Sequence, residues 1–471
     1  MAEAPATAGT LLWAARAWLP GGWHQDVLLQ AGADGYWSRV QAGVPAPAGA
    51  QVLAGPALPG LVDAHSHAFQ RAFAGLAERR ARDQDDFWGW RERMYGVALR
   101  VTPDQQHAIA AQLYSELLRG GYTQVCEFHY LHHAPDGKPY PGDPVHLLRA
   151  LAAGAAEVGI GLTLLPTVYE RAGFAQPALR EDQRRFRASA DAVLAMQAAL
   201  AGVLPAPLLR VGAALHSLRA ATPESLQRLA DQMPTAPLHI HVAEQTLEVQ
   251  DCLAATGLRP IEWLCRHAAL DARWHLVHAT HATPDEIDSV AGTGAGVVLC
   301  PSTEANLGDG VADLPGWLAA GVPLSLGSDS HVTRSMPEEL RLLEYSQRFV
   351  RRERCVAADP ARDEGSTAAR LWRRVLAGGA AAAGYGSWGL QAGARADLLV
   401  VDTQSPALLG IAPDQVLDAL VFSSPGRPFR DVMVAGAWRS QNHHLLPTTA
   451  GLDSAAIAAR FAGAMETLWS P

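Results

Sequence analysis

The sequence predicts an α/β fold, a (β/α)8 TIM-type barrel with a second, small β-domain built from both chain ends. Three observations predict it: apolar runs of strand length recur along the middle of the chain, helical patterns separate them, and further strand-like runs stand at both ends. The eight apolar runs of the middle are 60–64, 123–128, 161–169, 210–215, 237–242, 274–279, 296–300 and 323–327.

The remaining elements complete this alternation. Helical patterns are found at 104–119, 183–200, 223–232, 284–291 and, after the last apolar run, 337–352. Strand-like runs outside the middle are found at 10–15, 26–30, 396–401 and 431–434. We therefore divide the 471 residues into a small composite β-domain, 1–59 and 381–471, and a (β/α)8 barrel, 60–380. This length suits a barrel of about 250 residues or more with insertions and a small second domain.

Composition excludes several classes of protein. The net charge of −9 disfavours a general nucleic-acid binder, which is usually basic. The five cysteines are scattered and form no Cys-x-x-Cys pair, as expected of free thiols in a reducing compartment. The N-terminus has no basic signal-peptide region, and the uncharged stretches are interrupted by prolines and glycines. We expect a cytoplasmic protein that binds neither nucleic acid nor membrane.

Histidines stand at the ends of the predicted strands, the face on which barrel enzymes carry their chemistry. His65 and His67 end the first run, and the fifth run contains His239 and His241 on the same side of the strand. His241, nearer the strand end, is the better metal ligand, and we assign His239 to packing inside the barrel. Glu244 follows three residues later, where it can reach a metal-bound water without ligating the metal.

Two more polar groups arrive at strand ends. His278 ends the sixth run, and Asp329 follows the glycine-containing eighth run. His65, His67, His241 and Asp329 offer three nitrogens and one oxygen, which suits Zn²⁺ with an open position for water. Fe²⁺ is an alternative, because imidazole serves both metals.

The only lysine, Lys138, limits the number of metals. Two-metal relatives of this architecture often bridge their ions with a carboxylated lysine on the fourth strand. Here that run is followed by His216, so we expect one metal ion per chain.

This pattern resembles the amidohydrolase superfamily across nearly the whole chain, in PGLVDAHSH, HIHVAE, LVHATH, LGSDSH and GARADLLVVD. Within the superfamily, longer segments resemble the formimidoylglutamate deiminase family of bacterial histidine degradation. These are HSHAFQRAFAGLAE (65–78), FWGWRERMY (87–95), EFHYLHH (127–133), HSLRAATP (216–223), STEANLGDG (302–310) and GSDSH (327–331).

The resemblance implies a reaction and a set of roles. The reaction is zinc-dependent hydrolytic deimination of N-formimidoyl-L-glutamate to N-formyl-L-glutamate and ammonia by a metal-bound hydroxide. Glu244 would shuttle the proton, His278 would be its catalytic partner, and Asp329 would both bind metal and accept a proton. The implied contacts with the dicarboxylate substrate are Gln70, Arg91, Tyr130, His216 and Arg219. A homodimer is expected.

Other interpretations stay open. An amidohydrolase-type deaminase of a nucleobase or related ring would share the metal ligands, but it would need a flat aromatic slot and not paired arginines. A catalytically silent metal-binding barrel is disfavoured because a binding site needs no proton shuttle such as Glu244. Arg91 could be a surface ion-pair partner, and Tyr130 a packed aromatic. Four residues near the predicted mouth have no assigned role: His129, Ser302, Glu304 and Asn306.

Overall fold

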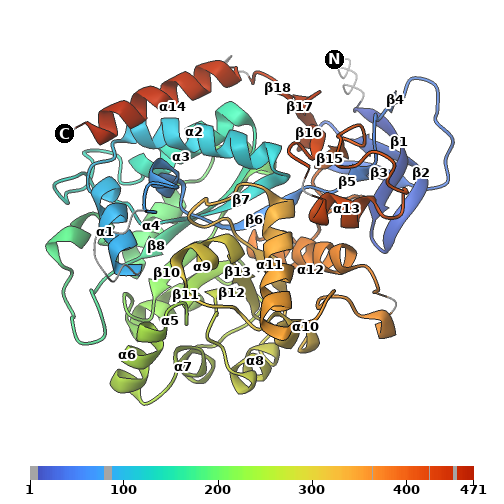
Figure 1. The fold of residues 1–471 in the computed structure, drawn as a ribbon. Coiled ribbons are helices and arrows are strands. Elements are labelled where there is room, and N and C mark those ends of the chain that lie inside the picture. Colours follow the sequence, from blue (N-terminus) through green and yellow to red (C-terminus); the bar gives the residue numbers. More distant parts are fainter. Residues whose placement is uncertain (1–8, 79–86, 363, 424, 449–452, 471) are drawn as a thin grey trace.

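The computed structural model describes residues 9–78, 87–362, 364–423, 425–448 and 453–470 (Figure 1). Its larger sheet is a nearly closed parallel barrel whose eight strands follow in sequence order around the axis. They are β6 (Leu61–Ser66), β7 (Tyr122–His129), β8 (Gly161–Val168), β10 (Ala213–Ser217), β11 (Leu238–Val242), β12 (Trp274–His278), β13 (Gly296–Leu299) and β14 (Leu324–Leu326). The short β9 (Leu209–Val211) pairs with β8 off this path. Each of the eight apolar runs therefore contributes a barrel strand, as predicted.

The first and last barrel strands meet just above their ends. A parallel bridge joins Ser66 to Asp329, and the Asp329 N–H donates to the His65 carbonyl oxygen at 2.9 Å. His65 and Asp329, two of the predicted metal ligands, therefore also take part in closing the barrel. Their spacing is set by backbone hydrogen bonds rather than by loop conformation.

Helices surround the barrel, and Figure 1 shows them on its outer side. They are α1 (Phe87–Ala98), α2 (Pro103–Arg119), α3 (His146–Val158), α4 (Ala190–Ala199), α5 (Pro223–Gln232), α6 (Thr246–Thr256), α7 (Pro260–His267), α8 (Pro284–Ala291), α9 (Pro301–Leu307), α10 (Leu314–Ala319), α11 (Met336–Arg351) and α12 (Thr367–Ala382). Helices α2, α5 and α8 begin at threonine caps: Thr102, Thr222 and Thr283 each accept a hydrogen bond from the N3 backbone N–H and precede a proline. No helix in the described ranges is long and apolar enough to cross a membrane.

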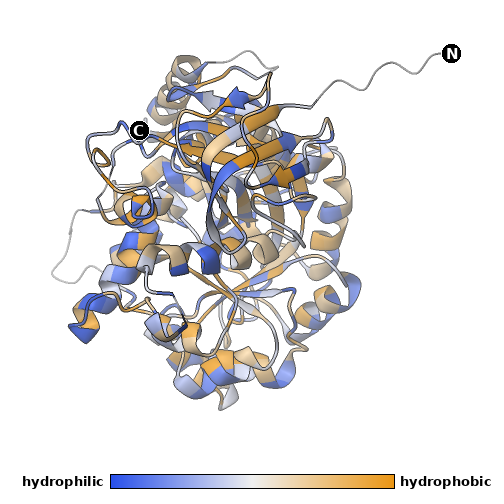
Figure 2. Cartoon of the chain, turned by 90° about the vertical axis from the view of Figure 1, so that its right-hand side faces the viewer, coloured by the Kyte–Doolittle hydropathy of each residue, from blue (hydrophilic) through white to orange (hydrophobic). Residues whose placement is uncertain are grey.

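The second sheet combines both ends of the chain, as predicted. Its order is β18-β17-β16-β15-β5-β1-β2-β3, with β4 beside β1. The amino-terminal strands are β1 (Leu11–Leu19), β2 (Gly22–Ala31), β3 (Trp37–Gln41), β4 (Gln51–Val52) and β5 (Ala57–Leu58). The carboxy-terminal strands are β15 (Leu398–Val401), β16 (Phe429–Val434), β17 (Ala437–Gln441) and β18 (His444–Leu445). Figure 2 shows hydrophobic residues concentrated on the strands of both sheets, with polar residues outside.

A buried arginine joins the two sheets. Arg395, just before β15, forms an ion pair with Asp397 at 2.6 Å. The same guanidinium donates to the Thr123 carbonyl oxygen on β7 at 2.8 Å and to the Gln124 amide oxygen at 2.5 Å. Because Arg395 is almost fully buried, its bonds to Thr123 and Gln124 are made only while the small sheet packs on the barrel.

Two segments differ from the simple alternation. The helical pattern at 183–200 is split into a 3₁₀ helix, η2 (Glu181–Phe186), and α4. Between them Ala188 pairs with Tyr169 through two backbone hydrogen bonds, of 2.9 and 3.0 Å, and the Ser189 side chain caps α4. The final helix, α14 (Ser454–Trp469), packs on α2 of the barrel, although our division assigned that stretch to the small domain. A further short helix, α13 (Val416–Phe422), packs on α11 and α12.

Candidate active site

Three imidazoles and one carboxylate converge at the carboxyl end of the barrel. The Nε2 atom of His65 lies 3.1 Å from Nε2 of His67 and 3.0 Å from Nε2 of His241. Oδ1 of Asp329 lies 3.6 Å from His65 Nε2 and 3.5 Å from His67 Nε2. All four side chains are buried. The predicted ligands are therefore brought together from β6, β11 and the turn after β14.

The second nitrogen of two rings is already engaged. Nδ1 of His67 lies 2.7 Å from the Phe128 carbonyl oxygen, and Nδ1 of His241 lies 2.8 Å from the His216 carbonyl oxygen. A carbonyl oxygen only accepts, so both rings carry their proton on Nδ1 and present an unprotonated Nε2 to the centre. Burial is the largest effect and lowers the pKa of all three histidines, and repulsion from neighbouring imidazoles lowers it further; at His67 the hydrogen bond to Phe128 opposes these effects. Neutral imidazoles with converging lone pairs fit a divalent metal ion.

The backbone at these strand ends is strained. Ala243, His278 and Asp329 all adopt positive φ angles, of 50°, 69° and 49°. Such angles are uncommon for residues other than glycine, and they concentrate at functional sites. These residues lie where the chain leaves a barrel strand, and His278, Asp329 and Glu244, which follows Ala243, all line the pocket.

His278 lies between three carboxylates. Its Nε2 is 3.8 Å from Glu244 Oε1 and 3.7 Å from Asp329 Oδ2, and its Nδ1 is 3.4 Å from Glu304 Oε1. Burial lowers the pKa of His278, but the nearby carboxylates outweigh it and raise the pKa to about 10. Burial also raises the pKa of Asp329 to about 7, although the His278 charge opposes this effect. The site therefore holds one carboxyl group with a pKa near neutral pH beside a histidine that keeps its proton there.

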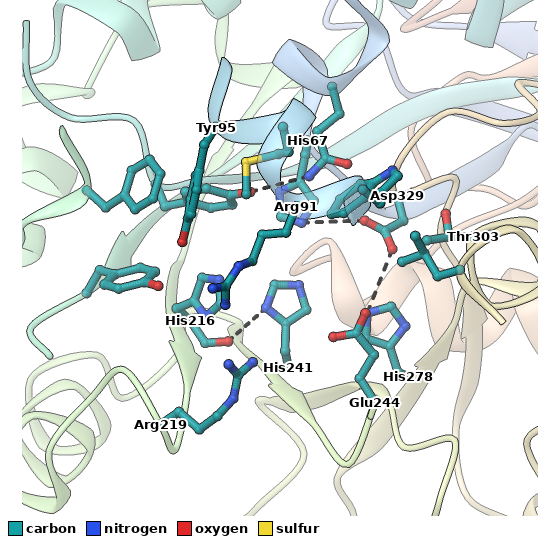
Figure 3. Close-up of a pocket in the computed structure, with 17 residues that line it drawn as sticks. His67, Arg91, Tyr95, His216, Arg219, His241, Glu244, His278, Thr303 and Asp329 are labelled. Atoms are coloured by element: carbon teal, nitrogen blue, oxygen red, sulfur yellow. Dashed lines mark hydrogen bonds and ion pairs between the residues drawn. The ribbon is translucent and has the colours of Figure 1, made fainter. Parts of the chain in front are cut away.

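The pocket above these groups is polarised. Figure 3 shows the guanidinium groups of Arg91 and Arg219 on one side and the carboxylates of Glu244 and Asp329 on the other. The buried Nε of Arg219 has no hydrogen-bond partner, and the charge of Arg219 opposes the effect of burial, which raises the pKa of Glu248. Arg91, on α1, lies 5.5 Å from the Tyr95 ring centroid and feels the Arg219 charge, while burial lowers its pKa.

The other predicted contacts also line this pocket. The Gln70 amide donates to the Tyr130 hydroxyl at 3.3 Å, while the buried Gln70 Oε1 has no partner. The His216 ring packs against Tyr130 with centroids 5.4 Å apart. Every predicted site residue thus borders the pocket except His65, which lies beneath it as part of the ligand cluster.

Sequence reasoning missed one wall of the pocket. Its remaining lining residues are mostly apolar and aromatic: Trp90, Met94, Tyr95, Tyr169, Phe186, Thr303 and Leu307. Met94 lies four residues after Trp90 in α1, and Tyr95 lies four residues after Arg91, so the helical period of FWGWRERMY could have indicated them. No sequence pattern indicated Tyr169 and Phe186. Their rings come into contact because the Tyr169–Ala188 bridge, which interrupts the 183–200 segment, brings the two chain segments together.

Two histidines lie away from the reacting groups. His239, assigned to packing, is buried inside the barrel with Nε2 2.9 Å from the Ala382 carbonyl oxygen. His129 is buried with Nε2 2.6 Å from the Leu131 carbonyl oxygen. Neither ring lines the pocket.

A parallel barrel with histidines, a glutamate and an aspartate at its carboxyl strand ends is the arrangement of metal-dependent hydrolases. The model of the amidohydrolase family matches residues 57–439, and the chain belongs to this family. It is 46% identical over 429 residues to a formimidoylglutamate deiminase of Pseudomonas aeruginosa, covering 91% of this chain and 94% of that protein.

A further sequence relative and a solved structure are also similar to this chain. A 5-methylthioadenosine/S-adenosylhomocysteine deaminase of Natronomonas pharaonis is 28% identical, with 80% of each chain covered. The crystal structure of an amidohydrolase from Brucella melitensis superimposes with a TM-score of 0.90 at 40% identity, covering 98% of this chain and 100% of that one. The chain is thus an amidohydrolase, and the resemblance predicted from its motifs is confirmed.

Proposed function

We propose that this amidohydrolase hydrolyses N-formimidoyl-L-glutamate to N-formyl-L-glutamate and ammonia. The observation that carries the proposal is the charge polarity of the pocket, with Arg91 and Arg219 facing Glu244 and Asp329. The substrate has the matching polarity, because its formimidoyl group is amidinium-like and its glutamate portion carries two carboxylates. The similarity to the Pseudomonas aeruginosa deiminase supports the same substrate.

The arginines suit the glutamate portion. A guanidinium can bind a carboxylate through two parallel hydrogen bonds, and it stays charged when partly buried. Arg219 has an unpartnered buried Nε, and leaving such a donor unsatisfied costs about 1–3 kcal/mol. A substrate carboxylate would remove that cost. Tyr130, His216 and the free Gln70 Oε1 can add directional hydrogen bonds.

We propose that His65, His67, His241 and Asp329 hold one zinc ion. Three Nε2 atoms and a carboxylate oxygen are a typical ligand set for a catalytic zinc ion with one open position. When bound, such an ion supplies hydroxide near neutral pH by lowering the pKa of water to about 7. Fe²⁺ could use the same ligands.

The remaining steps belong to the chain's own side chains. Asp329 can take the proton that water loses as it attacks the amidine carbon. Glu244 then takes the remaining hydroxyl proton of the tetrahedral adduct and delivers it to the departing nitrogen; the C–N bond breaks, the C=O bond of the formyl group forms, and the nitrogen leaves as ammonia. His278, between Glu244 and Asp329, can stabilise the negative charge that develops on the attacking oxygen.

The test is ammonia release from N-formimidoyl-L-glutamate by purified protein, with metal content measured on the same sample. Turnover with one equivalent of zinc per chain is the expected result. Zinc without ammonia release, together with deamination of 5′-methylthioadenosine or guanine, would favour the ring-deaminase alternative. The aromatic wall of Tyr95, Tyr169 and Phe186 is the observation on which that alternative rests.

Two properties of the whole protein stay predictions. All five cysteines are unpaired, in keeping with a cytoplasmic location. A homodimer is our expectation for the assembled enzyme, and light scattering coupled to gel filtration would test it.

A further inference from the structure

Glu304, which sequence reasoning left without a role, is held in place by the start of its own helix. It lies in the first turn of α9, directly after β13. Its Oε1 accepts a hydrogen bond from the Cys300 backbone N–H at 2.8 Å, and its own N–H donates to the Cys300 carbonyl oxygen at 2.9 Å. The side chain is buried, so its carboxylate has a defined position before any substrate binds.

The same oxygen faces His278. Oε1 of Glu304 lies 3.4 Å from Nδ1 of His278, on the side of the ring opposite Glu244 and Asp329. The ring also stacks on His241, with an interplanar angle of 14° and centroids 5.5 Å apart. The stacking restrains the plane of the His278 ring. The contact with Glu304 involves Nδ1 only, so it also determines which way round the ring lies in that plane.

We propose that Glu304 is the positioning residue for His278: it accepts the Nδ1 proton and so holds Nε2 toward the reacting atoms. The inference rests on the proposed function, in which His278 acts beside Glu244. The χ2 angle of histidine is broad and can flip, and a flipped ring would place a carbon atom where Nε2 is needed. A carboxylate at Nδ1 makes only one of these orientations favourable, as it does in carboxylate–histidine pairs of other enzymes.

A second interpretation of the same atoms can be weighed. One ligand atom each from His278, Cys300 and Glu304 lie within 4.8 Å of one another, close enough to surround a metal ion. A thiol must lose its proton to bind zinc, and burial raises the pKa of Cys300 well above its ordinary value. The Glu304 oxygen also already accepts the Cys300 N–H. Hydrogen bonding therefore explains this cluster better than a second metal.

The test is a double-mutant cycle on kcat, KM and metal content with Glu304→Ala and His278→Asn. We expect Glu304→Ala to lower kcat about 100-fold, with KM within threefold and metal content unchanged, because losing one preorganised group that stabilises developing charge costs about 10²–10³-fold in kcat. Glu304→Gln should recover at least tenfold of this loss, since an amide oxygen can accept the same proton. In the His278→Asn background, adding Glu304→Ala should lower kcat by less than a further threefold, because the residue that Glu304 positions is already absent.

Glu339→Gln is the matched control. Glu339 is also buried and also binds the start of α9, through the Ser302 N–H at 3.0 Å, but it does not contact His278. Its kcat should stay within threefold of wild type. The proposal is overturned if Glu304→Ala retains wild-type kcat, if its effect multiplies with that of His278→Asn, or if Glu339→Gln is equally damaging.

The two proposals fail separately. Wild-type protein that releases no ammonia from N-formimidoyl-L-glutamate would remove the proposed substrate. The cycle would then be run on whichever substrate, 5′-methylthioadenosine or guanine, the wild-type protein deaminates. A non-multiplicative cycle there would still support the role of Glu304, and a multiplicative one would overturn it.

Discussion

Nε2 of His278 lies 3.8 Å from Oε1 of Glu244, and both side chains are buried at the mouth of the barrel. The Glu244 carboxylate is the nearby charge that most strongly raises the pKa of His278. Because Asp329 approaches the same nitrogen, the proposed metal site and the proposed proton shuttle share one histidine. Substitution of Glu244, which is not a proposed metal ligand, should therefore lower turnover without lowering metal content.

Glu244→Gln should keep metal and lose turnover. The amide has the shape of the carboxylate but cannot carry a proton to the departing nitrogen, so kcat should fall by about 10²–10⁴-fold. Elemental analysis and steady-state assays on one preparation test this. Wild-type kcat in the variant would eliminate Glu244 as the proton shuttle.

Arg219→Met should weaken use of the dicarboxylate substrate without changing metal content. Losing a charge-assisted bond in a buried site costs about 2–5 kcal/mol, so kcat/KM should fall at least about 30-fold. N-formimidoyl-L-glutamine serves as the substrate control, and the parallel variant Arg91→Met shows which arginine reads the side-chain carboxylate. The arginine that binds this group should lose its discrimination between the two substrates when it is replaced. Unchanged kcat/KM in both variants would contradict recognition of glutamate by these arginines.

Removing the metal should abolish activity and lower stability together. A ligand that binds only the folded state stabilises it by about 4 kcal/mol when present at 1,000 times its dissociation constant. We therefore expect chelator-treated protein to melt at a lower temperature, and stoichiometric zinc to restore both the melting temperature and turnover. The His241→Ala variant is the control, because added zinc should not rescue it. Full activity after complete metal removal would refute the metal site.

The barrel strands and the predicted metal ligands could be identified from local sequence patterns, for a physical reason. Barrel strands are continuous apolar runs, and their carboxyl ends meet on one face, so His65, His241 and Asp329 could be brought together without coordinates. What local patterns could not show was contact between distant segments. The Ala188–Tyr169 bridge, which places Phe186 in the pocket wall, depends on tertiary hydrogen bonds and not on helical period.

Glu304 illustrates the same limit within the site. Its position near the mouth followed from the end of the seventh barrel strand. Its contact with Nδ1 of His278, however, depends on how the first turn of α9 folds back on Cys300. One residue of shift in that helix would point the carboxylate elsewhere, and the sequence has no marker that sets this register.

Arg395→Ala should destabilise the whole protein more than the site. It would leave Asp397 buried without its partner and remove the hydrogen bonds to Thr123 and Gln124 on β7. Breaking a buried pair from one side costs about 3–5 kcal/mol. The expected result is a clearly lower melting temperature with kcat near wild type in the folded fraction. Arg39→Ala, on the exposed strand β3, is the control, and an equal effect there would rule out the buried pair as the cause.

Glu339 should make stability fall as pH rises. Burial raises the pKa of this carboxyl from 4.5 to about 8, while its hydrogen bonds from Ser302 oppose the shift. Between these two values the folded state keeps a proton that the unfolded state releases. The contribution of Glu339 to the free energy of unfolding is therefore complete below pH 4.5. It decreases as pH rises toward 8, by at most about 1.4 kcal/mol per pH unit.

Comparing wild type with Glu339→Gln isolates this one group. The amide is uncharged at every pH and can still accept the Ser302 N–H bond, so it imitates the protonated acid. Titrating groups that do not interact with Glu339 contribute equally to both proteins and cancel in the difference, whereas Asp63 and Glu304 interact with its charge. Melting temperatures measured from pH 6 to pH 8.5 should shift steadily in favour of the glutamine variant. A difference independent of pH would mean that Glu339 is ionised in the folded protein, and the Ser302 hydroxyl and N–H would then be binding a carboxylate rather than an acid.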